Sequence, residues 1–168
     1  SVPAGSGGLF TLPYFAGERT PIHDPQAKGM IFGLQPHHTR AHLYRSALEG
    51  IGYSIAQHFD LLAENRLPVH KIMAVGGGAK NPLWLQIVAD MLNREIFVPE
   101  VTVGACYGAA ILCTLACGCY DSLEALGEKI RISRTIRPIP ENHAVYQKGK
   151  PVFQRLYEAT KELMHGLL

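Results

Sequence analysis

Three consecutive glycines at positions 76–78 constrain the fold of this chain more than any other feature of the sequence. The apolar run before them, residues 71–75, predicts a short strand covered on both faces. After them, Asn81 suits a helix N-cap, and Pro82 suits the first helical position, where its missing N–H costs no hydrogen bond. The stretch therefore predicts a strand, a tight turn and a helix over residues 82–92.

A glycine turn at the start of a helix predicts an anion or nucleotide site. Free backbone N–H groups and about half a positive charge gather at a helix N-terminus, and glycines let a bulky ligand approach the backbone. The alternative is a tight turn that binds nothing, since short motifs match by chance. The stretch is not a Walker loop, because Lys80 is not followed by Ser or Thr, and the dinucleotide spacing G-x-G-x-x-G fails at Asn81.

A further strand is predicted at residues 95–98, so that the chain reads strand, helix, strand. This order predicts a right-handed parallel crossover. In an open α/β sheet a ligand binds outside the carboxyl ends of the strands. The expected ligand position is therefore the glycine turn.

The rest of the chain shows the pattern of a helix-rich α/β domain. Residues 39–63 predict an amphipathic helix, with Tyr44 and Ile51 on its apolar stripe and with Gly50 and Gly52 allowing close packing. Residues 104–117 are almost all small or apolar and predict a helix buried on every side. The other expected elements are strands within 9–14 and 29–34, a short helix over 121–126, an extended segment over 131–140 and a closing helix over 146–167.

Length and composition fit one domain and exclude several classes of protein. The 168 residues, 47% of them hydrophobic, suffice for one core. The formal charge of +2 argues against a nucleic-acid partner, and Lys129, Arg131, Arg134 and Arg137 are interpreted as a solvated edge. No signal peptide opens the chain, and no apolar run approaches the ~20 residues of a membrane span.

Cysteines and histidines do not predict a metal site. The four cysteines lie within positions 106–119 without a Cys-x-x-Cys spacing. They are interpreted as buried, reduced thiols of a cytoplasmic protein. His37, His38 and His42 lie close together, but no carboxylate or cysteine completes a ligand set, so a polar helix entrance is the preferred interpretation.

Three charged residues are given no catalytic role. Glu18 and Arg19 form a charged dipeptide in a turn-rich loop, which favours a structural role. Glu49 lies beside the apolar stripe of the long helix. It either reaches solvent or accepts a structural hydrogen bond.

Several motifs follow one another along almost the whole chain beyond about Leu9. The first is a pair of segments, residues 29–34 and residues 42–49, with a gap of seven residues between them. The others are Gly17-Glu18-Arg19-Thr20-Pro21 with Asp24-Pro25 and Lys28-Gly29, the Gly-Gly-Gly-Ala-Lys-Asn turn with Trp84, Gln86 and Asp90, and Gly108-Ala109-Ala110. Together they resemble the FGGY carbohydrate kinases, the first pair resembling the second signature of that family. Residues 18–21 resemble the ketose kinases, particularly the xylulose-type pentulose kinases.

The resemblance implies an actin-like ATPase, ribonuclease H-like α/β fold, here partial, with a short, mostly parallel sheet flanked by helices. In this family two such domains close on ATP and a sugar. The γ-phosphoryl group of MgATP is transferred to a hydroxyl of a ketose, polyol or related sugar. ATP, ADP and Mg²⁺ are therefore the implied ligands, together with a small-molecule sugar.

The resemblance also implies which part of the kinase the chain represents. Residues 9–168 correspond to the C-terminal nucleotide-binding domain, and residues 1–8 are expected to be a flexible leader or an expression remnant. By position, Gly78 and Asn81 match nucleotide-contacting residues of the family, with Gly77 and Ala79 beside them in the same turn.

Important parts of the family's machinery have no counterpart in this sequence. Both phosphate loops, the general base and most sugar-contacting residues are expected in an N-terminal domain or in the stretch before Ser1, as are most contacts to Mg²⁺. No catalytic residue and no metal ligand is therefore assigned here, and the isolated chain is predicted to be inactive. The alternative is a non-catalytic nucleotide-sensing or interaction module with the same fold. Homo-oligomerisation is left open.

Overall fold

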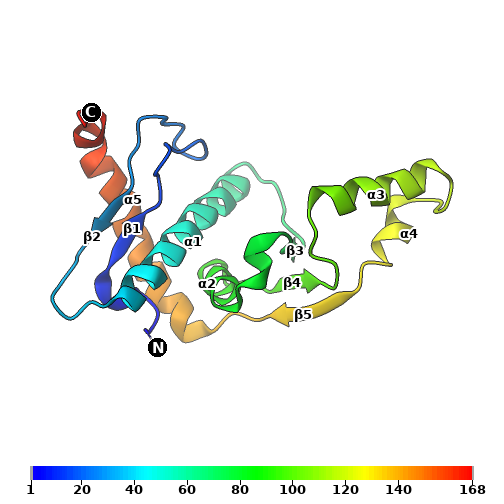
Figure 1. Cartoon of the computed structure of the whole chain (residues 1–168), viewed down its shortest axis with the longest axis horizontal. Coiled ribbons are helices and arrows are strands. Elements are labelled where there is room, and N and C mark those ends of the chain that lie inside the picture. The colour runs from blue at the N-terminus through cyan, green and yellow to red at the C-terminus, as the bar shows by residue number, and fades with distance from the viewer. Residues whose placement is uncertain (1, 168) are drawn as a thin grey trace.

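The computed structural model describes residues 2–167, which form a helical body around two small sheets and an arm that projects from it (Figure 1). The strands are β1 (Phe10–Leu12), β2 (Met30–Phe32), β3 (Ile72–Met73), β4 (Ile96–Pro99) and β5 (Ile132–Ile136). The α-helices are α1 (Arg40–Glu64), α2 (Pro82–Leu92), α3 (Ala105–Ala116), α4 (Leu123–Gly127) and α5 (Pro140–His165), with short 3-10 helices η1 (Ser6–Gly8) and η2 (Gly77–Lys80). Within residues 2–167, no helix is both long enough and apolar enough to cross a membrane.

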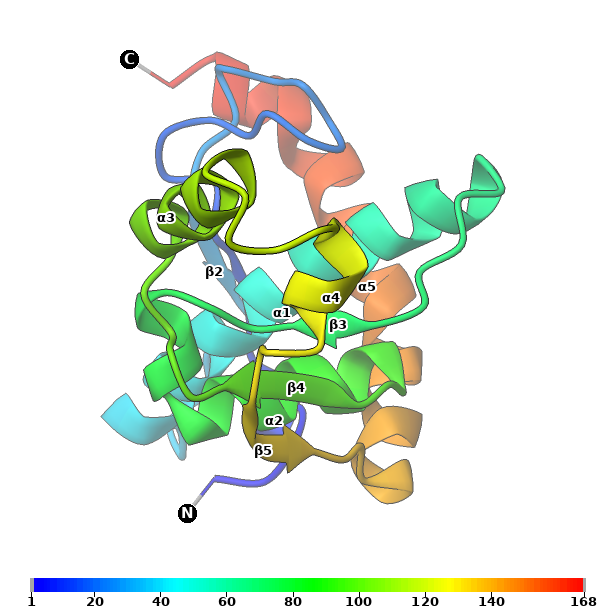
Figure 2. The same cartoon turned by 90° about the vertical axis from the view of Figure 1, so that its right-hand side faces the viewer.

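The sheet that carries the glycine turn is mixed, so the prediction of a mostly parallel sheet is wrong. β3 runs parallel to β4, with Ile72 opposite Ile96, which confirms the parallel strand–helix–strand unit. β5 runs antiparallel to β4, with Ile136 opposite Ile96. After β4 the chain passes through α3 and α4, and β5 then runs back along β4 (Figure 2). β1 and β2 pair antiparallel in a separate two-stranded sheet.

α1 packs closely against α2 and β1 because two of its residues have no side chain. A Cβ on Gly52 would lie 2.6 Å from Sδ of Met91. A Cβ on Gly50 would overlap the carbonyl oxygen of Thr11 in β1. The predicted use of both glycines is therefore confirmed.

The buried face of α1 differs from the predicted apolar stripe. Tyr44 is 56% exposed and Ile51 is 38% exposed. The buried residues of α1 are instead mostly small or polar: Ser46, Glu49, Gly50, Gly52, Tyr53, Ser54 and Ala56. Because the glycines let α2 and β1 approach the helix axis, burial shifts to their face, and two of the larger side chains of the predicted stripe lie at the surface.

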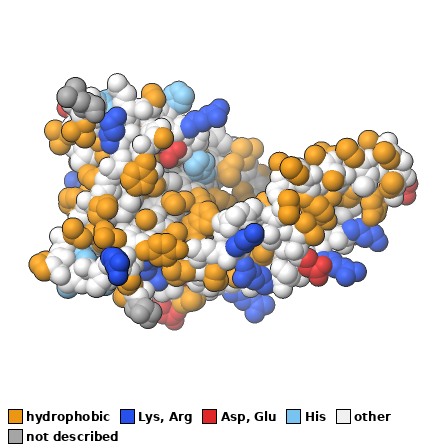
Figure 3. All heavy atoms as spheres, in the orientation of Figure 1, with side chains coloured by type: hydrophobic (Ala, Val, Ile, Leu, Met, Phe, Trp, Pro, Cys, Tyr) orange, Lys and Arg blue, Asp and Glu red, His pale blue; other side chains and the backbone are white. Residues whose placement is uncertain are grey.

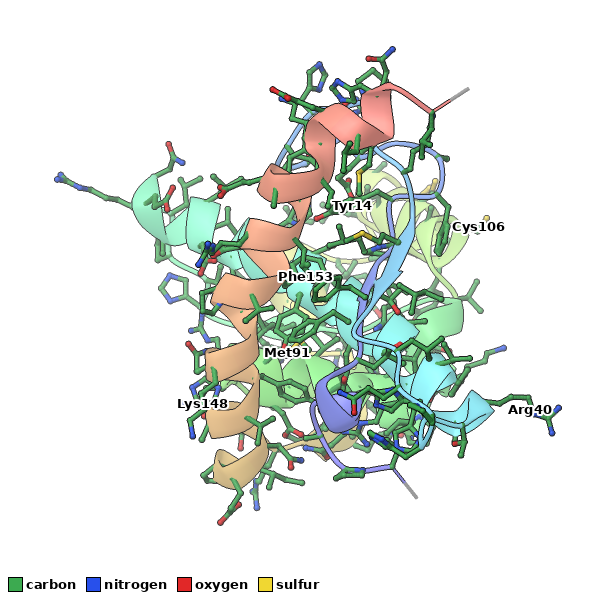
Figure 4. The ribbon with its side chains drawn as sticks, turned by 90° about the vertical axis from the view of Figure 1, so that its left-hand side faces the viewer. Tyr14, Arg40, Met91, Cys106, Lys148 and Phe153 are labelled. Atoms are coloured by element: carbon green, nitrogen blue, oxygen red, sulfur yellow. The ribbon has the colours of Figure 1, made fainter. Side chains whose placement is uncertain are left out.

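The main core lies where β1, α1, α2 and α5 meet. Aromatic rings occupy its centre, and the rings of Tyr14 and Phe153 meet edge to face with centroids 6.3 Å apart. Figure 4 shows Tyr14, Phe153 and Met91 turned into the body, whereas Arg40 and Lys148 point outward. Aromatic pairs of this geometry each contribute about 0.5–1.5 kcal/mol beyond the burial of their surface.

α3 and α4 form the projecting arm, so the predicted burial of residues 104–117 is wrong. α3 has no charged residue, yet none of its residues is buried, and hydrophobic side chains dominate the arm in Figure 3. All four cysteines are exposed, so their interpretation as buried thiols is also wrong. An apolar sequence predicts burial only where another surface covers the helix, and among the described elements α3 packs mainly against the short α4.

Glu49 ties the start of the described chain to α1 and α5. Its carboxylate accepts hydrogen bonds from Gly5 N (3.0 Å), Ser6 Oγ (2.7 Å), Arg45 Nε (2.8 Å) and the Tyr146 hydroxyl (2.9 Å). Burial, followed by the charge of Glu49, raises the pKa of Tyr146. Of the two alternatives for Glu49, the structure shows the hydrogen-bonded, structural one.

Candidate functional site

The glycine turn lies at the carboxyl ends of the two parallel strands. β3 ends at Met73, and the amide of Gly76 donates a hydrogen bond of 2.7 Å to the carbonyl of Thr102, in the segment that follows β4. Gly76 has a φ of 82°, a left-handed conformation that glycine adopts without strain. η2 follows and leads directly into α2. The turn therefore occupies the edge of the sheet where ligands bind in α/β folds.

Asn81 caps α2, as predicted. Its Oδ1 accepts hydrogen bonds from Leu83 N (3.1 Å) and Trp84 N (3.2 Å), and its carbonyl accepts one from Leu85 N. Pro82, at the first helical position, has no N–H to donate. Every amide of this first turn thus has a partner inside the protein, so the free N–H groups expected at the start of α2 are already paired.

The unpaired amides belong to the turn before α2. Within residues 2–167, neither Gly77 N nor Gly78 N donates a hydrogen bond to another group. A Cβ on Gly77 would meet no described atom within 4 Å, so open space lies beside this residue. Two successive unpaired N–H donors, with open space beside Gly77, suit an acceptor-rich ligand such as a phosphate or a ribose.

Gly77 and Gly78 lack side chains for different physical reasons. A Cβ on Gly78 would overlap the indole ring of Trp84. That ring packs against the core under the turn, and its Nε1 is buried without a hydrogen-bond partner in the described structure. Internal packing therefore requires glycine at position 78, whereas position 77 is open to a ligand.

Ala79 and Arg134 lie on the protein side of the turn. Ala79 is 3% exposed and packs with Leu85 and Val98 in the core beneath the sheet. Its carbonyl accepts a hydrogen bond of 2.6 Å from the guanidinium of Arg134 on β5. The sequence predicts only a solvated edge for Arg134, whereas the structure shows that it also brings a positive charge to the turn.

Tyr44 reaches the turn from α1. Nδ2 of Asn81 donates a hydrogen bond of 3.0 Å to the hydroxyl of Tyr44. The structure thus brings Tyr44, which the sequence pattern places on the core stripe, into contact with Asn81 at the end of the glycine turn. No local signal links two residues 37 positions apart, so the sequence could not predict this contact.

The motif at residues 17–25 forms a braced loop away from the glycine turn. Oε1 of Glu18 accepts hydrogen bonds from the amides of Arg19 and Thr20, which confirms a structural role for Glu18. The Asp24 carboxylate accepts hydrogen bonds of 2.7 Å from both His165 Nε2 and the Tyr157 hydroxyl. The bond from His165, followed by that from Tyr157, lowers the pKa of Asp24 to about 2.

The histidines near residue 40 form the entrance of α1. Nδ1 of His42 accepts a hydrogen bond of 3.2 Å from the amide of Thr39, and the side chain of Thr39 caps the helix in return. This reciprocal arrangement is a capping box, which satisfies two amides at the helix start. Among residues 2–167, no three side chains of the metal-binding types converge on one point.

The fold and the position of the turn define the class of the protein. The α/β fold, with its glycine turn at the carboxyl edge of a small sheet and helices against it, is shared with solved sugar kinases, whose fold is that of the actin-like ATPases. The chain belongs to the FGGY family of carbohydrate kinases. The pattern described as "FGGY family of carbohydrate kinases, C-terminal domain" matches residues 1–117, which confirms the resemblance seen in the motifs.

The chain is similar to family members that are named xylulose kinase or gluconokinase. Xylulose kinase from Bacillus subtilis is 35% identical over 168 residues, which cover 99% of this chain and 34% of the relative. Gluconokinase from Bacillus subtilis is 38% identical over 156 residues, which cover 92% of this chain and 30% of the relative. The crystal structure of xylulose kinase from Rhodospirillum rubrum matches with a TM-score of 0.82 at 33% identity, over 98% of this chain and 32% of that one. The chain therefore spans about a third of the length of these relatives.

Proposed function

We propose that this chain is the nucleotide-binding part of an ATP-dependent sugar kinase. The complete enzyme transfers the γ-phosphoryl group of ATP to a hydroxyl of a sugar. The observation that carries this proposal is the pair of unpaired amides at Gly77 and Gly78, which lie beside Asn81 at the carboxyl edge of the sheet. The family match supports the same reaction.

The residues of the turn bind and orient the donor without themselves reacting. Phosphoryl transfer depends mainly on positioning the donor and on neutralising charge around its phosphates. Gly77 and Gly78 offer backbone N–H groups, Asn81 offers a carboxamide N–H, and Arg134 adds a positive charge behind the turn. Ala79 takes part only through its backbone, since its side chain is buried.

The remaining catalytic parts are proposed to lie outside residues 1–168. Mg²⁺ neutralises phosphate charge when it is bound, and we expect its ligands, the general base and most sugar contacts in the part of the kinase that this chain does not contain. The isolated chain is therefore expected to bind nucleotide weakly and to transfer no phosphoryl group. We also propose that the complete kinase acts in the cytoplasm.

The proposed acceptor is a ketose or a related sugar acid. The relatives are named xylulose kinase and gluconokinase, so xylulose is the first acceptor to test and gluconate is the second. A panel of sugars, coupled to ADP release by the complete gene product, tests the function. If none of the sugars in the panel caused ADP release, the proposal would be contradicted.

Substitution of Asn81 tests the assignment of the site. Asn81→Ala removes both the cap of α2 and the Nδ2 donor, whereas Asn81→Ser keeps a capping oxygen and removes the Nδ2 donor. Both variants of the complete protein should raise the Michaelis constant for ATP more than that for the sugar. An equal change in both constants would argue against placing Asn81 on the nucleotide.

The same measurements distinguish the sugar kinase from the alternative, a non-catalytic nucleotide-sensing module. A complete gene product that binds ATP or ADP but phosphorylates no sugar would be a nucleotide-sensing module. If ATP and ADP changed no amide chemical shift between Gly76 and Asn81, the turn would be a structural connection only.

A further inference from the structure

Hydrogen bonds to two different helices fix the orientation of the Asn81 carboxamide. Oδ1 faces α2, where it accepts the amides of Leu83 and Trp84. Nδ2 faces α1, where it donates to the hydroxyl of Tyr44. One hydrogen of Nδ2 is used in that bond, so one remains for a ligand.

Core packing does not account for the position of Tyr44. Its side chain is 56% exposed, although it extends from a helix whose neighbouring residues Ser46 and Glu49 are almost fully buried. For an exposed residue of this size, the hydroxyl contact with Asn81 is the specific interaction that the structure records.

The frame that holds these two residues together is closely packed and capped at both helix starts. α1 and α2 approach closely at Gly52, against the side chains of Met91 and Ile87. The start of α1 is fixed by its capping box and the start of α2 by Asn81 itself. The distance between Tyr44 and Asn81 is therefore set by the packing of two capped helices.

We infer that Tyr44 is a positioning residue of the nucleotide site: its hydroxyl holds the Asn81 carboxamide so that the second Nδ2 hydrogen points toward a nucleotide on the glycine turn. This inference rests on the proposed function. A carboxamide held before binding does not lose rotational freedom when the ligand arrives, so the affinity for the nucleotide is higher. Tyr44 contacts the nucleotide only through Asn81.

Two substitutions in the complete gene product test this role. Tyr44→Phe removes only the hydroxyl and should weaken binding of MgADP, measured by calorimetry, by about threefold to tenfold, the range expected for one hydrogen bond. Tyr44→Leu removes the ring as well and should weaken it at least as much. Phe32→Leu is the matched control, since it removes a half-exposed aromatic ring on β2 and should leave the affinity unchanged.

Kinetics distinguish positioning from general damage to the fold. Tyr44→Phe should raise the Michaelis constant for ATP and leave that for the sugar unchanged, and in an Asn81→Ser background it should have no further effect because its target is gone. Wild-type affinity in both Tyr44 variants would overturn this inference and leave the proposed function standing. Failure of the wild-type protein to bind MgADP would overturn both.

Discussion

The two glycines at the centre of the turn should respond in opposite ways to the same substitution. In Gly78→Ala, the new Cβ would overlap the Trp84 ring, with Cε3 at 2.6 Å and Cη2 at 2.8 Å, where ordinary contacts begin at 3.4 Å. The ring cannot simply swing away, because it packs in the core under the turn with its Nε1 buried. The turn or the ring must therefore shift, at the cost of an overpacked core, about 1–3 kcal/mol.

Gly77→Ala is the matched control at the adjacent position. Its Cβ would meet no described atom within 4 Å, and the backbone of Gly77 is not in the left-handed region. Because Ala restricts the unfolded chain more than Gly does, stability should stay the same or rise by about 0.4–1 kcal/mol. The added methyl group should nevertheless weaken nucleotide binding, since it points into the space proposed for the ligand.

Thermal unfolding followed by circular dichroism measures the difference. Each kcal/mol corresponds to about 2–4 °C in Tm for a domain of this size, so Gly78→Ala should melt several degrees below Gly77→Ala. In a double-mutant cycle, Gly78→Ala should cost much less when Trp84 is already Leu, since the clash is then removed. Equal melting temperatures for the two alanine variants, or an undiminished cost in the Trp84→Leu background, would refute this explanation of Gly78.

Two further predictions concern buried carboxylates. The pKa of Asp24 is lowered from 3.8 to about 2 in the folded protein, so its contribution to stability is complete above about pH 4 and is lost as the pH falls toward 2. The melting temperature, plotted against pH over this range, should therefore change less for Asp24→Asn than for wild type. The same pH dependence in both proteins would contradict the role of the hydrogen bonds of Asp24. Asp90 is fully buried, and its carboxylate accepts hydrogen bonds from the amide of Ile139 and the carboxamide of Gln86. Asp90→Ala should therefore lower the free energy of unfolding, measured by urea denaturation, by about 1–3 kcal/mol. Gln86→Ala leaves the hydrogen bond from Ile139 intact and should lower this free energy by less.

Local rules in the sequence were sufficient for the glycine turn and its neighbours. Pro82 and Asn81 have strong positional preferences at a helix start, and the predicted helix over residues 82–92 has the observed bounds of α2. The parallel strand–helix–strand unit was also predicted, from the order of a strand, a helix and a strand along the chain. The ordered motifs then identified the family, which the comparison confirmed.

Features that depend on what lies opposite an element could not be read from the sequence. The apolar composition of α3 predicted burial, but composition does not say whether a covering surface is present, and the structure leaves this helix exposed. The direction of β5 depends on how the chain returns after α4, which no local pattern encodes. Tyr44 lies on the expected stripe but is exposed, because the glycines of α1 moved the packed face to another side of the helix.

The candidate site shows the same division. The sequence determined that a glycine turn ends a strand and that Asn81 begins the next helix, since both follow from backbone preferences of single residues. Only the tertiary structure decided which amides remain unpaired, that Gly78 makes room for Trp84, and that Tyr44 and Arg134 reach the turn. These are contacts between segments far apart in the chain, and they depend on how the elements pack rather than on what each element is.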